Sequence, residues 1–317
     1  MASTFVFSAD IGGTTIKLGL FQADGTLLEK WEILTRTHNN GEDILPDVAR
    51  SISEKMQQKT LIPEQVLGIG IGVPGPVDAD NNVFCCENLG WDAFNVTQRM
   101  NELLPAIPKV SAGNDANLAT LGELWMGSGK GCRSAVMFTL GTGVGAGVVV
   151  DGRVVAGADG AAGEVGHMTV EPNETTPCAC GKCGCLEQYA SANGIVRLAK
   201  RMLAACDTPS NLRSMASYTA KDICDLARDG EQMAGAIFDR CARYLGLATS
   251  WVGETVNPQV FIIGGGMSRA GSMLTDAIAA YYRSFVYHPC KNTPFVIARL
   301  GNDAGIYGCA KLVLDCC

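Results

Sequence analysis

Four cysteines lie close together in the middle of the chain, at Cys178, Cys180, Cys183 and Cys185, and His167 shortly precedes them. A structural Zn²⁺ ion takes four thiolate or imidazole ligands, and one histidine with three cysteines fills such a closed site. Five candidate side chains compete for four positions, so one is left over. The chain has only 3 histidines, which makes one beside this cluster informative. The pattern predicts a structural zinc ion that pins an irregular loop.

Two acidic residues flank this cluster. Glu164 lies just before His167, and Glu187 directly follows the last cysteines. Carboxylates held beside a fixed metal site suit hydrogen bonding to the hydroxyls of a sugar. Ordinary surface acids would give the same sequence.

A second candidate for chemistry is the pair Asn114 and Asp115, which follows a short expected strand and opens a helix. Transfer of a phosphoryl group to an alcohol needs a carboxylate that accepts the hydroxyl proton. Asparagine and aspartate are also favoured as helix caps for stability alone. From spacing alone, the cap is the favoured interpretation.

Glycine-rich turns offer the third chemical feature. The sequences IGGTT (11–15) and GTG (141–143) each connect two expected strands, so their backbone N–H groups can form a cradle for phosphate oxygens. Asp10 heads the first turn and could hold Mg²⁺, and Lys17 lies just beyond it. Neither turn fits the Walker or the Rossmann pattern. A third turn, GGGMS (264–268), suits packing against a flat ligand such as adenine.

The elements that must position these residues alternate between strands and helices. Hydrophobic periodicity predicts strands over 5–10, 16–21, 26–34, 66–74, 108–113, 134–140, 144–150, 153–157, 260–263 and 294–300, and helices over 42–59, 116–127, 192–205, 220–228, 232–256, 270–283 and 303–314. The pattern of strand, glycine turn, strand, turn, strand occurs twice. This weak internal repeat predicts an α/β protein with two similar halves, each contributing a glycine turn to a shared cleft.

Composition excludes several classes of protein. Hydrophobic residues make up 47% and charged residues 18% of the 317 residues, which excludes a disordered chain. A formal net charge of -7 argues against binding nucleic acid, which needs excess lysine and arginine. No segment has the length of a membrane span or the pattern of a signal peptide. We therefore expect a cytoplasmic protein that binds neither nucleic acid nor membrane.

The other cysteines are scattered among apolar neighbours and are expected to be small buried hydrophobes or inert surface thiols. They are Cys85, Cys86, Cys132, Cys206, Cys224, Cys241, Cys290, Cys309, Cys316 and Cys317.

Motifs spread along the chain resemble those of the ROK (repressor, open reading frame, kinase) family. They are DIGGTTIK (10–17), PGPVD (74–78), GNDAN (113–117), LGTGVGAG (140–147), GEVGH (163–167), CACGKCGCLE (178–187), IIGGGMS (262–268) and GNDAGIYG (301–308). Within the family, GVPGPVD, ENLGW and ASANGIVRLAK are most similar to the bacterial glucokinases.

The resemblance implies an actin-like (ribonuclease-H-like) ATPase fold with two domains around a central cleft. We expect a smaller domain over 1–118 plus 302–317 and a larger one, carrying the zinc loop, over 119–301. The resemblance also implies that Asp115 is the general base for the sugar 6-hydroxyl. The implied sugar contacts are Gly75, Asn88, Asn114, Asp115, Glu164, His167 and Glu187. The implied zinc ligands are His167, Cys178, Cys180 and Cys185, with Cys183 at a variable position.

The expected activity is phosphorylation of glucose by ATP with Mg²⁺, the first step of glucose use in glycolysis. The expected nucleotide contacts are Asp10, Gly12, Gly13, Thr14, Thr15, Lys17, Thr139, Gly141, Thr142, Gly143, Gly265 and Gly266. N-acetylmannosamine, N-acetylglucosamine, fructose or allose are alternative substrates, and a sugar sensor with little turnover is an alternative function. The first phosphate turn starts at residue 10, which argues against a preceding DNA-binding domain. The family also suggests a homodimer or homotetramer.

Overall fold

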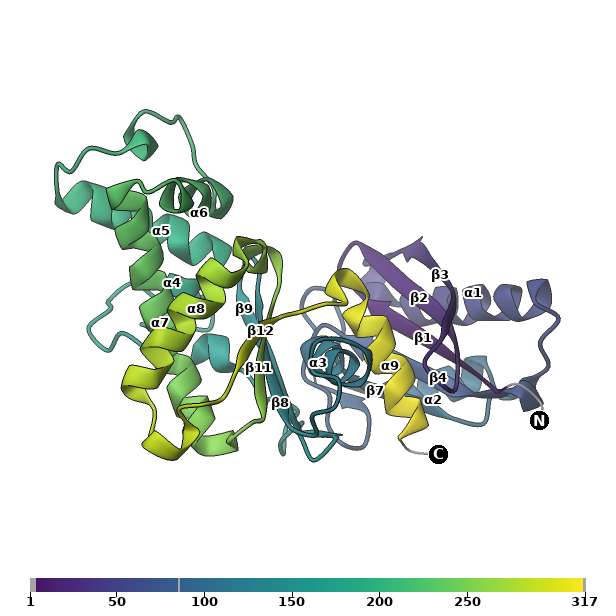
Figure 1. The fold of residues 1–317 in the computed structure, drawn as a ribbon. Coiled ribbons are helices and arrows are strands. Elements are labelled where there is room, and N and C mark those ends of the chain that lie inside the picture. The colour runs from purple at the N-terminus through teal and green to yellow at the C-terminus, as the bar shows by residue number, and fades with distance from the viewer. Residues whose placement is uncertain (1–3, 85, 316–317) are drawn as a thin grey trace. The chain divides into compact units, whose positions relative to one another are not determined.

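The computed structural model describes residues 4–84 and 86–315, so that Cys85, Cys316 and Cys317 lie outside the described residues. Its first sheet is mixed, with strand order β3-β2-β1-β4-β7 (Figure 1). β1 pairs antiparallel with β2 and parallel with β4, and β4 pairs parallel with β7. The strands are β1 (Phe5–Ile11), β2 (Thr15–Gln22), β3 (Leu27–Leu34), β4 (Val66–Val73) and β7 (Val110–Asn114).

Helices cover both faces of this sheet. α1 (Ile44–Gln58) and α2 (Val96–Leu103) contribute buried residues to the same core as the sheet strands. α9 (Ala304–Leu314) contributes to a second core with Val6 and Phe21, on the opposite face because side chains alternate along a strand. α3 (Asp115–Met126) packs along α9.

The second sheet repeats the order of the first, as β10-β9-β8-β11-β12. The predicted internal repeat is thereby confirmed. β8 pairs parallel with β11, as β1 does with β4. The strands are β8 (Ala135–Leu140), β9 (Val144–Val150), β10 (Arg153–Val154), β11 (Val260–Gly264) and β12 (Phe295–Ile297).

Helices α4 (Glu187–Ala190), α5 (Ala192–Ala205), α6 (Ala220–Arg228), α7 (Gln232–Val256) and α8 (Ser272–Phe285) follow β9 and β10 or lie between β11 and β12. An aromatic cluster joins α8 to the sheet. Tyr282, which is fully buried, packs edge-on against Phe261 of β11 and Phe295 of β12, at centroid distances of 5.5 and 5.1 Å. Such edge-to-face contacts add to the burial of apolar area.

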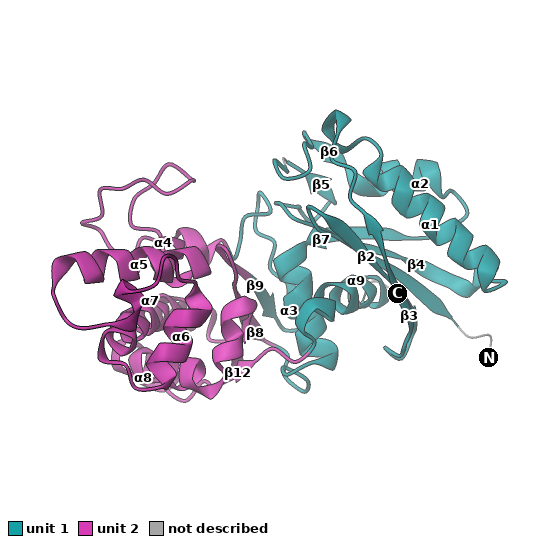
Figure 2. Ribbon diagram, turned by 90° about the horizontal axis from the view of Figure 1, so that it is seen from above, with its two compact units in different colours: residues 1–133, 147–163, 300–317 teal, residues 134–146, 164–299 magenta. Residues whose placement is uncertain are grey.

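Tertiary contacts divide the chain into two compact units, drawn in teal and magenta in Figure 2. Unit 1 comprises residues 1–133, 147–163 and 300–317, and unit 2 comprises 134–146 and 164–299. The expected boundaries, 1–118 plus 302–317 against 119–301, differ from this division. The reason is that α3 packs against α9 so closely that a Cβ atom on Gly122 would collide with the backbone of Ala304. Residues 119–133 therefore belong with unit 1.

Short elements complete the fold. β5 (Asn82–Val83) and β6 (Phe94–Asn95) form a small antiparallel hairpin. Single-turn 3₁₀ helices are η1 (Asn39–Gly41), η2 (Pro63–Gln65), η3 (Val165–His167), η4 (Asn211–Arg213), η5 (Gly266–Ala270), η6 (His288–Cys290) and η7 (Gly301–Asp303). Among residues 4–84 and 86–315, there is no helix with the length and apolar character needed to cross a membrane.

Candidate functional site

The polar residues of unit 1 gather where parallel strands end. Asp10 of β1 lies level with Gly72 of β4, which in turn lies level with Gly113 of β7. The carboxyl ends of parallel strands are where open α/β sheets bind ligands. Asp10 and the pair at 114–115 therefore share one edge of the sheet.

Asp10 lies in a tight, glycine-lined position. A Cβ atom on Gly305 of α9 would collide with its carboxylate, and one on Gly72 would lie 3.0 Å from Oδ1. The pKa of Asp10 is raised to about 6, chiefly by burial and also by the negative charge of Asp115, whereas the positive charge of Lys17 opposes both. Lys17 itself pairs with Asp10 across the sheet and donates to the Asn302 carbonyl at 2.9 Å. A cation bound beside this carboxylate would stabilise its ionised form.

Asn114 caps α3 and also contacts the neighbouring loop. Its Oδ1 accepts from the Asn117 backbone N–H at 3.1 Å, which is the predicted cap. Its Nδ2 donates to the carbonyl of Gly75 at 3.1 Å. Asp115 begins α3, and its Oδ1 accepts from the Ala116 N–H at 2.7 Å. The cap uses Oδ1 of Asn114 and the loop contact uses Nδ2, while Asn88 lies exposed in the turn at 87–90.

The first glycine turn is closed by a hydrogen bond from the Gly12 N–H to the Thr15 carbonyl at 3.0 Å. The Thr14 carbonyl accepts from the Thr35 N–H, which holds the turn against the end of β3. A Cβ atom on Gly13 would meet nothing within 4 Å, so the protein's own packing does not require glycine there. That open space suits a ligand's phosphate.

The second glycine turn is also closed by a backbone hydrogen bond. The Gly141 N–H donates to the Gly143 carbonyl at 3.0 Å, and a Cβ atom on Gly141 would also meet open space. Thr142 at its tip is exposed. A Cβ atom on Gly143 would lie 2.8 Å from Oε2 of Glu187, so glycine lets this turn approach that carboxylate.

The third glycine turn follows β11 at the same edge, because Gly264 lies level with Thr139 of β8. Gly265 has φ +79°, and a Cβ atom there would lie 2.5 Å from the Leu140 carbonyl oxygen. Gly266 begins the 3₁₀ helix η5, so the helix expected from residue 270 starts only at Ser272 of α8. A Cβ atom on Gly266 would meet nothing within 4 Å.

The predicted metal ligands come together in unit 2. One ligand atom from each of His167, Cys178, Cys180 and Cys185 lies within 4.8 Å of the other three. Cys183 is not part of this group. Cys178 and Cys185 are buried and Cys180 is exposed. Three thiols and one imidazole at such spacing match the donor set of a tetrahedral zinc site.

Glu187 lies beside this cluster. Its Oε1 is 3.8 Å from Nδ1 of His167 and accepts from the Cys178 thiol at 3.0 Å. Glu164 is exposed and immediately precedes η3, which ends at His167. A Cβ atom on Gly166 would collide with the Val144 carbonyl, so η3 lies directly on the start of β9.

The sequence analysis missed one group beside the cluster. We call residues 168–186 the cysteine loop. Glu174 in this loop forms ion pairs with Arg197 and Arg201 of α5, so the loop has contacts that order it besides the predicted metal site. The two arginines are four positions apart, which places them on one helix face. The spacing of these two arginines was the only sequence signal that could have indicated an acidic partner.

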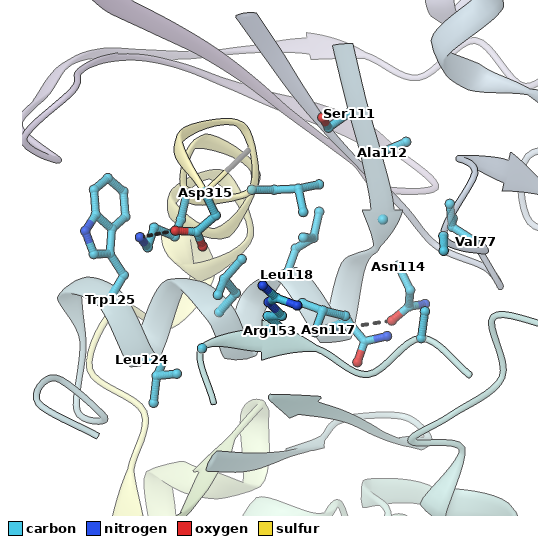
Figure 3. Close-up of a pocket in the computed structure, with 18 of the residues that line it drawn as sticks. Val77, Ser111, Ala112, Asn114, Asn117, Leu118, Leu124, Trp125, Arg153 and Asp315 are labelled. Atoms are coloured by element: carbon cyan, nitrogen blue, oxygen red, sulfur yellow. Dashed lines mark hydrogen bonds and ion pairs between the residues drawn. The ribbon is translucent and has the colours of Figure 1, made fainter. Parts of the chain in front are cut away.

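Unit 1 contains a cavity of about 870 Å³ (Figure 3). Leu118, Leu124 and Trp125 of α3 line it, with Arg153 of β10 pointing into it. It reaches Asn114 but neither Asp10 nor Asp115 is among its lining residues. The lining of the cavity therefore does not include these two carboxylates.

The model of the ROK family matches residues 6–316. A glucokinase of Halalkalibacterium halodurans is 36% identical, with 99% of this chain and 96% of the relative covered. A glucokinase of Thermotoga maritima is 35% identical over 98% of this chain and 97% of its own.

A solved structure extends the likeness to three dimensions. It is the crystal structure of a ROK family glucokinase from Streptomyces griseus in complex with glucose and AMPPNP. The TM-score is 0.74 at 30% identity, covering 97% of this chain and 98% of that chain.

Proposed function

The chain belongs to the ROK family, and we propose from that premise that it is an ATP-dependent sugar kinase that phosphorylates glucose at its 6-hydroxyl. The fold is the actin-like ATPase fold of this family. Glucokinases at 35 and 36% identity over nearly the whole chain support the activity. The observation that carries the proposal is the placement of Asp115 with Asp10 at the carboxyl edge of the first sheet.

We assign the role of general base to Asp115. Its carboxylate would accept the proton of the 6-hydroxyl as the hydroxyl oxygen forms its bond to the terminal phosphorus of ATP and the bond to ADP breaks. Asn114 beside it is fixed by bonds to both α3 and the Gly75 carbonyl. Because the cap and the loop share this asparagine, the start of α3 is held rigid, as in-line attack requires.

The glycine turns are proposed to hold the nucleotide. Residues 12–15 and 139–143 supply backbone N–H groups and threonine hydroxyls for phosphates. The turn of Gly265 and Gly266 is the proposed contact for adenosine, since a Cβ atom on Gly266 would meet open space. ATP use by this family implies a divalent metal ion, which we propose to be Mg²⁺. It would neutralise developing charge on the phosphates, and Asp10 is the carboxylate placed to hold it.

Glu164, His167 and Glu187 are proposed sugar contacts. We further propose that His167, Cys178, Cys180 and Cys185 bind a structural zinc ion, because four suitable ligand atoms gather there. A zinc ion in this site would fix the ring of His167, leaving its other nitrogen for a sugar hydroxyl. Gly75 and Asn88 complete the proposed sugar contacts on unit 1.

The deciding experiment measures ADP release with Mg²⁺ and ATP on glucose, mannose, fructose, N-acetylglucosamine and N-acetylmannosamine. We expect glucose to lead in kcat/KM by about tenfold, which corresponds to ~1.4 kcal/mol of transition-state discrimination. Asp115→Asn should bind glucose normally while kcat falls by about a thousandfold or more.

Each outcome decides one part of the proposal. A higher kcat/KM for an N-acetylated sugar would overturn glucose as the substrate, but the proposed kinase activity and the role of Asp115 as base would stand. Near-normal turnover by Asp115→Asn would remove Asp115 from its role. Glucose binding by the wild-type protein without turnover would favour a sugar sensor instead.

We also propose a homodimer or homotetramer, which the family resemblance implies. Light scattering of the purified protein would measure the molar mass against 33.4 kDa for one chain. A mass of one chain would contradict it.

A further inference from the structure

The cysteine loop carries a buried carboxylate at its centre. The side chain of Glu174 is 2% exposed. An isolated buried charge is costly, so it needs partners that satisfy both oxygens. The side-chain partners of Glu174 come from two different helices, and its backbone partners come from the loop itself.

Five groups bind this carboxylate. Arg197 donates to it at 2.6 Å, and Arg201 binds both oxygens, with a distance of 2.9 Å to Oε1. The hydroxyl of Tyr189 in α4 donates at 2.6 Å. Within the loop, the N–H groups of Thr175 and Thr176 donate to Oε1 at 3.0 and 2.8 Å. One side chain therefore fixes the loop backbone and ties it to α4 and α5.

The same contacts hold the helix segment that carries Glu187. Gln188, the next residue, donates to the Thr176 carbonyl at 3.0 Å and accepts from the Cys185 N–H at 3.1 Å. Thr176 is thus bonded to both Glu174 and Gln188. Through these two residues, the carboxylate is connected to the backbone of a cysteine in the cluster.

A second acid holds the other arm of the loop. Glu171 accepts from the hydroxyl of Tyr244 in α7 at 3.1 Å. The ring centroids of Tyr244 and Tyr189 lie 4.5 Å apart, so the tyrosine partners of the two acids pack against each other. Arg197 also lies over the ring of Tyr189, 5.8 Å from its centroid.

We propose that Glu174 is a positioning residue that preforms the cluster of His167 and the cysteine thiols by anchoring the cysteine loop to α4 and α5. The metal then enters a site whose ligands are already gathered. This inference rests on the proposed function only for its consequence on the sugar, since the anchoring is a property of the protein by itself.

Glu174→Gln tests the anchoring, because it keeps the shape of the side chain and removes its charge. The readout is hydrogen exchange of the Cys178 and Cys185 backbone N–H groups. They donate to the Lys182 carbonyl and the Gln188 side chain, and neither touches Glu174. We expect exchange at both to accelerate about tenfold or more, in protein with and without added Zn²⁺.

Two further variants keep this test decisive. Glu231→Gln is the matched control, because Glu231 in unit 2 accepts from the N–H groups of Asn211 and Ala234 but has no contact with the loop. It should leave exchange at Cys178 and Cys185 unchanged. If Glu174→Gln fails to fold, Tyr189→Phe replaces it in the test. This variant removes one hydrogen bond to Glu174 and should accelerate exchange at Cys178 and Cys185 more weakly.

Acceleration confined to Thr175 and Thr176 would overturn the proposal, because it would show only the loss of their own acceptor. Equal acceleration in Glu231→Gln would overturn it as well, by showing general destabilisation of unit 2.

The consequence for the metal is measured by zinc release to a chromogenic chelator. We expect Glu174→Gln to release zinc about tenfold faster than wild type or Glu231→Gln, and KM for glucose to rise more than kcat falls. Unchanged release and unchanged KM in a folded variant would contradict positioning. A wild-type protein that binds no zinc would refute the proposed metal site, whereas the exchange experiment would still decide the role of Glu174.

Discussion

At the scale of single residues, Asp10 shows how burial changes the chemistry of a carboxyl group. Its pKa is raised to about 6, chiefly by burial, whereas that of the exposed Asp24 is lowered by its hydrogen bond to the Thr26 N–H. The sequence marks both only as aspartates near turns. The shift of Asp10 depends on burial by residues distant in the chain, such as Gly305, whereas that of Asp24 comes from a neighbour two positions along the chain.

Asp10 therefore has a signature in the pH dependence of stability. Because its folded pKa lies above the unfolded value of 3.8, the stability that it contributes is fully present below pH 3.8 and is lost as pH rises through about 6. The unfolding free energy of wild type relative to Asp10→Asn should fall by about 2 kcal/mol from pH 4 to 7. Urea denaturation without nucleotide or added metal measures it.

Asp24→Asn is the control for this prediction. The folded pKa of Asp24 is lowered, so the stability that Asp24 contributes is present above its unfolded pKa and is lost as pH falls. The unfolding free energy of wild type relative to Asp24→Asn should therefore change with pH in the opposite direction. A flat difference between wild type and Asp10→Asn across this range would show that Asp10 is not buried as described.

The site residues were predictable where their spacing is local. His167 and the cysteines, the glycine turns and the Asn114 cap were all visible as short motifs, and the structure brings the metal ligands together. The spare position of Cys183 came from the family pattern. The role of Glu174 was missed, because its arginine partners lie on a helix beyond the next element and a lone glutamate carries no motif.

At the scale of elements, hydrophobic periodicity identified the longer helices well. The helices predicted over 192–205, 220–228 and 232–256 have those bounds in α5, α6 and α7. α2 and the hairpin of β5 and β6 were missed, because α2 spans 8 residues and each strand only 2. β12 covers only 295–297 of the predicted 294–300.

The crossing of α3 and α9 depends on glycine. A Cβ atom on Gly308 would collide with the backbone of Leu118, and one on Gly122 with that of Ala304. We expect Gly308→Ala to lower the unfolding free energy by about 3 kcal/mol or more, because backbone cannot yield as a side chain can. Thermal and urea denaturation measure it.

Gly235→Ala is the matched helical control. A Cβ atom there would meet nothing within 4 Å, so alanine should stabilise α7 by about 1 kcal/mol through its better helix propensity. Equal effects of the two substitutions would refute close packing at Gly308.

Zinc removal is a prediction for the cysteine loop as an element. Protein treated with a chelator and then desalted should show a KM for glucose raised about tenfold or more, because the ring of His167 loses its metal. The N–H groups of Thr175 and Thr176 should keep their protection, since Glu174 holds them. Sugar kinetics and hydrogen exchange measure the two effects.

Addition of Zn²⁺ should restore KM, and assays with excess Mg²⁺ exclude an effect on the nucleotide. An unaltered KM in metal-free protein would contradict the role of zinc in aiming His167. Loss of protection at Thr175 and Thr176 would show that the metal, not Glu174, orders that part of the loop.

At the scale of the whole molecule, the two units are interleaved in sequence. The chain leaves unit 1 after residue 133, returns for 147–163, and returns again at 300. The repeat of sheet order was predictable from the two strand–turn patterns. The unit boundaries were not, because they follow from the packing of α3 on α9 rather than from any change in composition.

α9 is the element that this interleaving makes indispensable. Ile306, Ala310 and Val313 are buried against β1 and β2, and a Cβ atom on Gly70 of β4 would collide with the backbone of Cys309. A chain ending at residue 303 should lose cooperative unfolding of unit 1 and kinase activity. Calorimetry and the ADP-release assay measure this.

A synthetic peptide of residues 304–317 added in excess should restore part of the activity, because it supplies the missing face. Full activity of the shortened chain by itself would show that α9 does not complete unit 1.

The position of α9 after unit 2 also has a consequence during synthesis on the ribosome. When residue 299 is added, unit 2 is fully synthesised, whereas the strands of unit 1 still expose the apolar face that α9 will cover. Folding of unit 1 is completed only after α9 has been synthesised, although most of unit 1 is made first. This differs from the usual order, in which the domain made first also folds first. A chain whose translation stops short therefore exposes that face to chaperones and proteases, so that incomplete copies are marked for removal.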